Sequence, residues 1–129
     1  MNTTATYPEN PAASAEEKLF DLSMISNVCR GNEAAIHKMI HVFIRTVPAT
    51  VDEMKASLLA GDYEQLQQLA HRVKPTMSMY AIVKLEKDVH RIDRMQVDTL
   101  TAEELGHMMG KIERVIGAVT AELKKIVNH

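Results

Sequence analysis

The sequence contains no Trp, and aromatic residues make up only 4% of its 129 positions. Methionine, by contrast, is frequent, with nine copies. Sheets are enriched in aromatic and β-branched residues, so this composition favours aliphatic packing between helices. No segment shows the strict alternation of apolar and polar residues that is typical of a half-buried strand. We therefore predict an all-α fold.

Other features that the sequence lacks exclude several classes of function. The net charge is −2 and acids and bases are interspersed, so no basic face indicates binding to nucleic acid or an anionic membrane. No run approaches the roughly 20 apolar residues that a membrane-spanning helix needs. The single Cys29 cannot form an internal disulfide, and the first residues do not resemble a signal peptide. We expect a soluble, cytoplasmic, monomeric protein.

The length suits one domain, and 46% of the residues are hydrophobic, which is enough for one modest core. Residues 1–13 mix Thr, Asn and Pro without periodicity, and we expect them to form a disordered tail. Residues 14–129 are expected to form the folded domain.

Periodicity and capping residues predict five helices within this domain. Residues that commonly cap a helix stand at Ser14, Asn32, Asp62 and Thr101, and Glu17 and Glu104 complete capping boxes with the first and last of these. A short first helix should run from Ser14 to Gly31, and a second from Asn32 to Gly61 with a bend at Pro48. Short connections favour an antiparallel up-and-down four-helix bundle, with the short N-terminal helix as an addition.

The helix after Asp62 carries a histidine that its core does not need. Its predicted inner face consists of Leu66, Leu69, Ala70, Val73 and Met77. At about 100° per residue, His71 lies roughly 160° from the centre of that face. It should therefore face solvent, and a neutral, exposed imidazole is a competent nucleophile. Lys74, one turn further on, would offer a positive charge to a phosphoryl group carried on the ring.

The run from Phe20 to about Ile92 contains, in order, "FDLSMI", the Gly31–Glu33 turn, the segment "FIRTVPATVDEMKASL", and "AGDYEQLQQLAH" ending at His71 with Lys74 three residues later. With these features the run resembles a histidine-containing phosphotransfer (HPt) domain. The resemblance implies that His71 accepts a phosphoryl group and that Lys74 compensates its charge. Asp93 stands where the family often has Gln or Glu beside the ring, and it is a candidate to orient the imidazole.

The resemblance also implies the partners. The phosphoryl group would come from the aspartate of a receiver domain, in a response regulator or a hybrid sensor kinase, and pass to another receiver. The expected docking surface includes Gln67, Gln68, Pro75 and Ser78. No cofactor is expected on this chain, because Mg²⁺ would be bound by the receiver.

Four positions depart from the family pattern. Pro75 replaces the glycine that usually follows the lysine, Thr76 and Met77 replace two serines, and Ala81 replaces a later glycine. Pro75 cannot donate to the carbonyl of His71 and should kink the helix there. These departures favour an alternative, a degenerate HPt fold that binds receivers as a scaffold without transfer.

Two further activities are disfavoured. No glycine-rich or Asp-x-Gly segment is present to bind ATP, and Arg72 stands where a sensor kinase has an acidic residue after its histidine, so we expect no kinase activity. His37 and His41 are spaced to clip a metal ion on one helix, but no further ligand motif accompanies them. We expect no metal site.

Overall fold

Five helices make up the computed structural model, which describes residues 18–95 and 99–128. They are α1 (Ser23–Val28), α2 (Glu33–Leu59), α3 (Tyr63–Met79), α4 (Val83–Asp93) and α5 (Ala102–Val127). The described residues contain no strand. The predicted all-α class and the four helices of the bundle are confirmed, while the tail expected over residues 1–13 lies outside the described part.

Three predicted caps begin the helices as expected. The Asn32 side chain accepts a hydrogen bond from Ala35 N, and the Asp62 side chain accepts one from Gln65 N. Thr101 and Glu104 form the reciprocal capping box at the start of α5. Each of these side chains satisfies a backbone donor that the first helical turn leaves without a partner.

The start of the first helix was predicted wrongly. Residues 18–22 are not helical, and α1 begins only at Ser23. The Asp21 carboxylate accepts hydrogen bonds from the backbone N and the hydroxyl of Ser23, and the Asp21 amide donates to Tyr80 O at 2.9 Å. These bonds tie the segment to the end of α3 in a non-helical conformation. The capping box expected at Ser14 and Glu17 lies outside the described residues.

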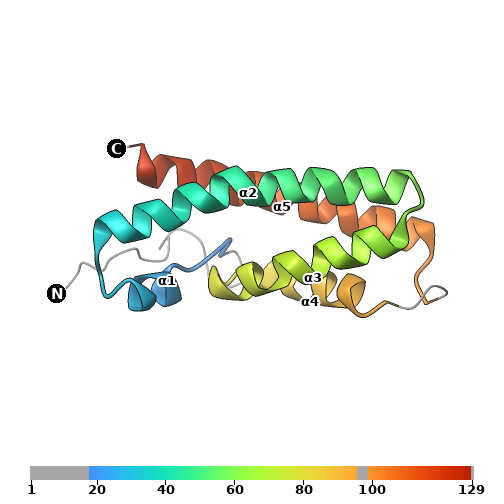
Figure 1. Ribbon diagram of the computed structural model, residues 1–129, viewed down its shortest axis with the longest axis horizontal. Helices are drawn as coiled ribbons and strands as arrows, with labels where there is room; N and C mark the ends of the chain where they lie inside the picture. The colour runs from blue at the N-terminus through green and yellow to red at the C-terminus, as the bar shows by residue number, and fades with distance from the viewer. Residues whose placement is uncertain (1–17, 96–98, 129) are drawn as a thin grey trace.

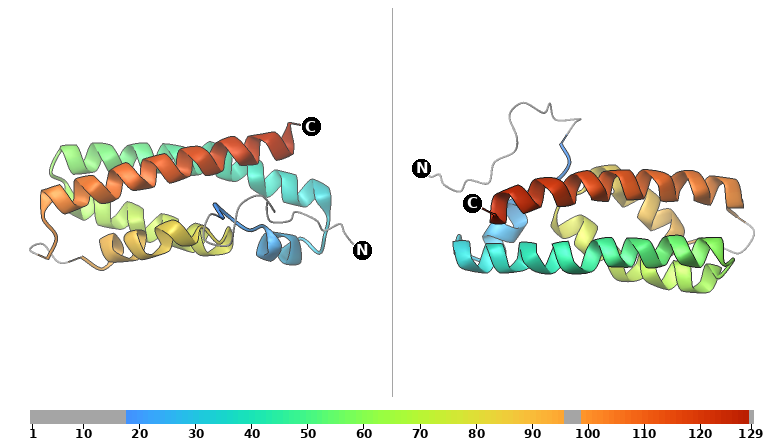
Figure 2. Two further views of the ribbon diagram at one scale, coloured as in Figure 1. Left: turned by 180° about the vertical axis from the view of Figure 1, so that it is seen from behind. Right: turned by 90° about the horizontal axis from the view of Figure 1, so that it is seen from above.

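The helices form an up-and-down bundle of unequal pairs (Figures 1 and 2). The long helices α2 and α5 lie side by side, and the shorter α3 and α4 pack beneath one end of this pair. Helix α1 lies beneath the other end, near the start of α2. The predicted bundle with a short additional N-terminal helix is therefore confirmed.

A single core runs between these layers. All residues of the predicted inner face of α3 are buried, and so are their counterparts on the other long helices: Ile36, Ile40, Phe43 and Val47 of α2, Leu85, Val89 and Ile92 of α4, and Leu105, Met108, Met109, Ile112, Ile116, Val119 and Leu123 of α5. Met39, Val115 and Ile126 are partly buried against this core. Because α3 buries one face completely, its opposite face is left for function.

The turns that follow α1, α2 and α3 share one geometry, and those after α2 and α3 differ in the residue at its critical position. After α2, Gly61 N donates to Leu58 O and Asp62 N to Ser57 O; after α3, Ala81 N donates to Ser78 O and Ile82 N to Met77 O. This is the Schellman pattern, which needs a left-handed residue after the helix. Gly61 has a φ of 73° and Ala81 a φ of 51°. The alanine therefore adopts a conformation that costs an L-residue energy.

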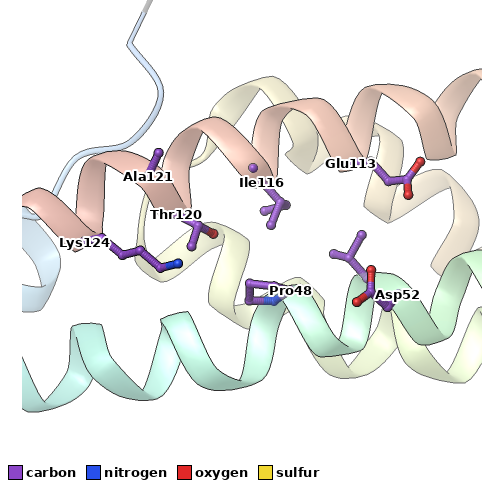
Figure 3. Close-up of a pocket in the computed structure, with 9 residues that line it drawn as sticks. Pro48, Asp52, Glu113, Ile116, Thr120, Ala121 and Lys124 are labelled. Atoms are coloured by element: carbon purple, nitrogen blue, oxygen red, sulfur yellow. The ribbon is translucent and has the colours of Figure 1, made fainter.

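Helix α2 continues through Pro48, whose ring lines a hollow between α2 and α5 (Figure 3). The hollow has a volume of about 350 Å³ and is otherwise bordered by residues of these two helices, among them Asp52, Glu113, Ile116 and Lys124. No residue of α3 or α4 lines it, so it is separate from the face that carries His71. Within the described ranges, no helix has both the length and the apolar character that crossing a membrane requires.

Candidate phosphoryl-acceptor site

His71 projects from the outer face of α3 into solvent. Its side chain is 77% exposed, as the helical periodicity predicts, while its neighbours Ala70 and Val73 are buried in the core. The buried side of α3 thus fixes the backbone that carries the ring, and the imidazole itself stays accessible. An incoming group can reach it without any opening of the bundle.

Asp93, the last residue of α4, contacts this imidazole. Its Oδ1 lies 3.0 Å from His71 Nδ1, and its side chain is only 9% exposed. An ionised carboxylate can only accept hydrogen bonds. Nδ1 must therefore carry the proton, which leaves the lone pair of a neutral ring on Nε2, the nitrogen not engaged by Asp93. The unprotonated nitrogen is the one available as a nucleophile.

Lys74 completes a network of three side chains across α3 and α4. Its ammonium group donates to Asp93 Oδ2 at 2.9 Å, so one carboxylate contacts both the histidine and the lysine. The hydrogen bond from Lys74 is the largest cause that lowers the pKa of Asp93; partial burial raises this pKa, and the bond from His71 lowers it further. Asp93 is therefore held in its ionised form, as the His71 tautomer requires.

The four residues expected in a docking surface do not share one environment. Gln68, Pro75 and Ser78 are exposed on α3 on either side of His71. Gln67 is partly buried, and its side-chain amide donates to Asp93 O at 2.7 Å and to Met95 O at 3.1 Å. These two bonds hold the end of α4 against α3, which keeps Asp93 within reach of His71. The amide of Gln67 thus has an internal structural role.

Helix α3 continues through Pro75 as far as Met79. A proline has no amide hydrogen, so the His71 carbonyl lacks the donor that it would normally have one turn later. Pro75 is exposed, and the contacts of His71 Nδ1 with Asp93 and of Lys74 with the same carboxylate are present alongside it. The proline therefore does not prevent the network from forming.

One neighbour of the site was not predicted from the sequence. His90 Nδ1 lies 3.3 Å from Lys74 Nζ. His90 precedes Asp93 by one helical turn, but its contact with Lys74 depends on how α4 is rotated against α3. A single histidine on an amphipathic helix is common, so no pattern in the sequence singled it out.

The alternative metal pair, His37 and His41, lies on α2, half-buried and exposed respectively. Among the described residues, no group of three or more His, Cys, Asp or Glu side chains is placed to hold a metal ion.

Comparison with known families agrees with this geometry. The family model of the Hpt domain matches residues 38–127, from the first turns of α2 to the end of α5. No curated protein and no solved structure matches the chain. The match covers four helices of the bundle, including α3 with its exposed His71. The chain belongs to the Hpt domain family, whose members act in phosphotransfer within two-component systems and interact with receiver domains.

Proposed function

We propose that His71 accepts a phosphoryl group from the aspartyl phosphate of a receiver domain and passes it to the aspartate of another receiver. The observation that carries this proposal is the 3.0 Å contact between His71 Nδ1 and Asp93 on an otherwise exposed ring. It supports a ring proton on Nδ1, so that Nε2, on the side of the ring away from Asp93, is the nitrogen that can react.

In this reaction, Nε2 attacks phosphorus in line with the bond to the receiver's carboxylate oxygen. The N–P bond forms as the P–O bond breaks, and the electron pair of that bond leaves with the aspartate. The His71 ring gains positive charge while its proton stays on Nδ1, and the Asp93 carboxylate stabilises that charge. Transfer to a second receiver is the reverse of these steps, with the partner's metal ion and lysine acting on its own aspartate.

Lys74 has two roles in this proposal. Its bond to Asp93 balances the charge of the carboxylate, which would otherwise repel a phosphoryl group. Of the three donors of its ammonium group, the bonds to Asp93 and His90 use two, and the third can meet a phosphoryl oxygen. The chain thus supplies a nucleophile, an orienting base and a cation, and the partner supplies the remaining chemistry.

The exposed face of α3 supports docking of a receiver around His71. Gln68, Pro75 and Ser78 lie on this face. A groove of about 340 Å³ between α2 and α3, lined in part by Met39, Val42, Phe43, Met79 and Tyr80, adds apolar surface on the α2 side of the helix. A partner that covers this face brings its aspartate over the imidazole.

The test is transfer from receiver domains of the same organism, each phosphorylated with acetyl phosphate, with the acid-labile phosphate on the chain as the readout. We expect labelling of the wild type and no labelling of His71→Gln. His41→Gln, which changes an exposed histidine on α2, is the matched control and should be labelled normally. Binding of a receiver without transfer would instead support the scaffold alternative, and labelling of His71→Gln would contradict the proposed acceptor.

A further inference from the structure

A small polar hollow adjoins the candidate site. It has a volume of about 290 Å³ and is lined by Lys74 and Ser78 of α3 and by Glu86, Lys87 and His90 of α4. Lys74 belongs to both places, because its ammonium group contacts Asp93 on one side and His90 on the other. The position of this cation therefore depends on two acceptors rather than one.

The direction of the Lys74–His90 hydrogen bond follows from chemistry. A lysine ammonium has three donors and no acceptor. His90 Nδ1, at 3.3 Å from Lys74 Nζ, must therefore be the acceptor, and the ring proton lies on Nε2. Only a neutral imidazole can make this contact, because both nitrogens of an imidazolium are donors.

We propose that His90 is a positioning residue for Lys74 and that it holds the ammonium group in place only while its own ring is neutral. This inference rests on the proposed function of His71 and adds a proton-dependent control of the same site. A second proton on His90 removes the acceptor and places two cations next to each other. Lys74 then keeps its hydrogen bond to Asp93, loses the one to His90, and moves away from His90.

The other charged groups around His90 are few. Glu86 and Lys87, on the preceding turn of α4, line the same hollow with opposite charges. Asp93, on the following turn, is already bonded to Lys74 and His71. Helix α5 contributes no residue to the hollow; its nearby ion pair, between Lys111 and Asp88, is separate. Histidine side chains in general change charge between about pH 5 and 8, which is the range that a pH titration of the contact must cover.

A direct test follows the Lys74 ammonium and the His90 ring by ¹⁵N NMR of the full chain from pH 8 to pH 5.5. The Lys74 Nζ resonance should shift with the same midpoint as the His90 ring nitrogens. In His90→Gln the amide oxygen keeps a neutral acceptor, so this step should vanish. His107→Gln, which changes an exposed histidine on α5, should retain it. A Lys74 resonance that does not follow His90 would overturn the inference.

A second measurement connects the contact to function without a partner protein. Phosphoramidate can load histidine directly, and the ratio of wild-type to His90→Gln loading rates cancels the pH dependence of the reagent. This ratio should fall by about threefold between pH 8 and pH 5.5, as for the loss of one exposed contact to a charged group. A flat ratio would contradict the inference. Failure of His71 to load in every variant would instead refute the proposed acceptor, and the NMR step would still decide the role of His90.

Discussion

Replacement of Asp93 by Asn tests the assignment of the nucleophilic nitrogen. The change is nearly isosteric, but an amide has one acceptor oxygen and one donor group where the carboxylate has two acceptors. The Lys74 ammonium, now 2.9 Å from Oδ2, can only donate and should therefore take the amide oxygen. The NH₂ group then faces His71 Nδ1, which must become the acceptor. The ring proton moves to Nε2, the nitrogen that should attack phosphorus.

The expected loss follows from the charge-assisted bond by which the Asp93 carboxylate stabilises the His71 ring as it gains positive charge, a bond that the neutral amide cannot replace. A hydrogen bond to a charged group contributes about 1.5 to 3 kcal/mol, and Asp93 has a side chain that is 9% exposed, so solvent screens it only partly. At about 1.4 kcal/mol per tenfold change, the loading rate of His71 should fall roughly 10- to 100-fold.

Two measurements check this prediction. The first is the initial rate of phosphoryl loading, from phosphoramidate and from a phosphorylated receiver. The second is ¹⁵N NMR of the His71 ring, which should have its proton on Nδ1 in the wild type and on Nε2 in Asp93→Asn. Asp88→Asn, which breaks the ion pair with Lys111 at 3.0 Å, is the control for losing a carboxylate of α4. A wild-type loading rate together with an unchanged tautomer would refute the reasoning.

Three further predictions concern stability. Ala81→Gly should raise the free energy of unfolding by about 0.5 to 1 kcal/mol, because glycine relieves the left-handed strain at a smaller cost in chain entropy. Gly61→Ala, where a Cβ would meet no atom within 4 Å, should lower the free energy of unfolding by a similar amount. Urea titrations measure both changes, and variants as stable as the wild type would contradict the strain argument. The lowered pKa of Asp93 means that its stabilisation is present above about pH 4 and is lost as pH falls through the folded-state pKa. The free energy of unfolding of Asp93→Asn should therefore fall less steeply in acid than that of the wild type. An identical dependence on pH in the two proteins would contradict this prediction. Burial raises the pKa of Tyr80 to about 12, so its contribution should be lost between about pH 10 and 12. Tyr80→Phe should show less alkaline loss, and it should also lose about 1 kcal/mol at neutral pH with the bond to Met39 O at 3.0 Å.

The long helices could be predicted because their signals are local. Asn32, Asp62 and Thr101 cap them through bonds to residues three positions later, and the apolar periodicity identifies the buried faces. The first helix could not be placed in the same way. Its N-terminal side is held by Asp21 N bonding to Tyr80 O, a contact between segments far apart in the sequence. Apolar spacing predicts that Leu19 and Phe20 belong to this helix. In the structure both residues pack against the core, but the segment that carries them is not helical.

The candidate site was predictable to the extent that it depends on one helix or on the family pattern. The outward orientation of His71 follows from periodicity, and the spacing of the Hpt pattern drew attention to Lys74 and Asp93. The partners of Gln67 are backbone carbonyls of Asp93 and Met95, which no side-chain pattern reveals. The contact between Lys74 and His90 depends on how α4 is rotated against α3. Such details require the packed structure.

Under the proposed function, the exposure of His71 bears on the lifetime of the phosphoryl group that it would carry. Because the side chain is 77% exposed, an attached phosphoryl group would not be shielded from water. The loaded form would therefore decay at the pace set by the nitrogen–phosphorus bond itself, and a docked receiver would shield it while bound. The fraction of phosphorylated chain that reaches a receiver would then depend on how soon a receiver binds, so the abundance of receivers would set how long the relay stays active.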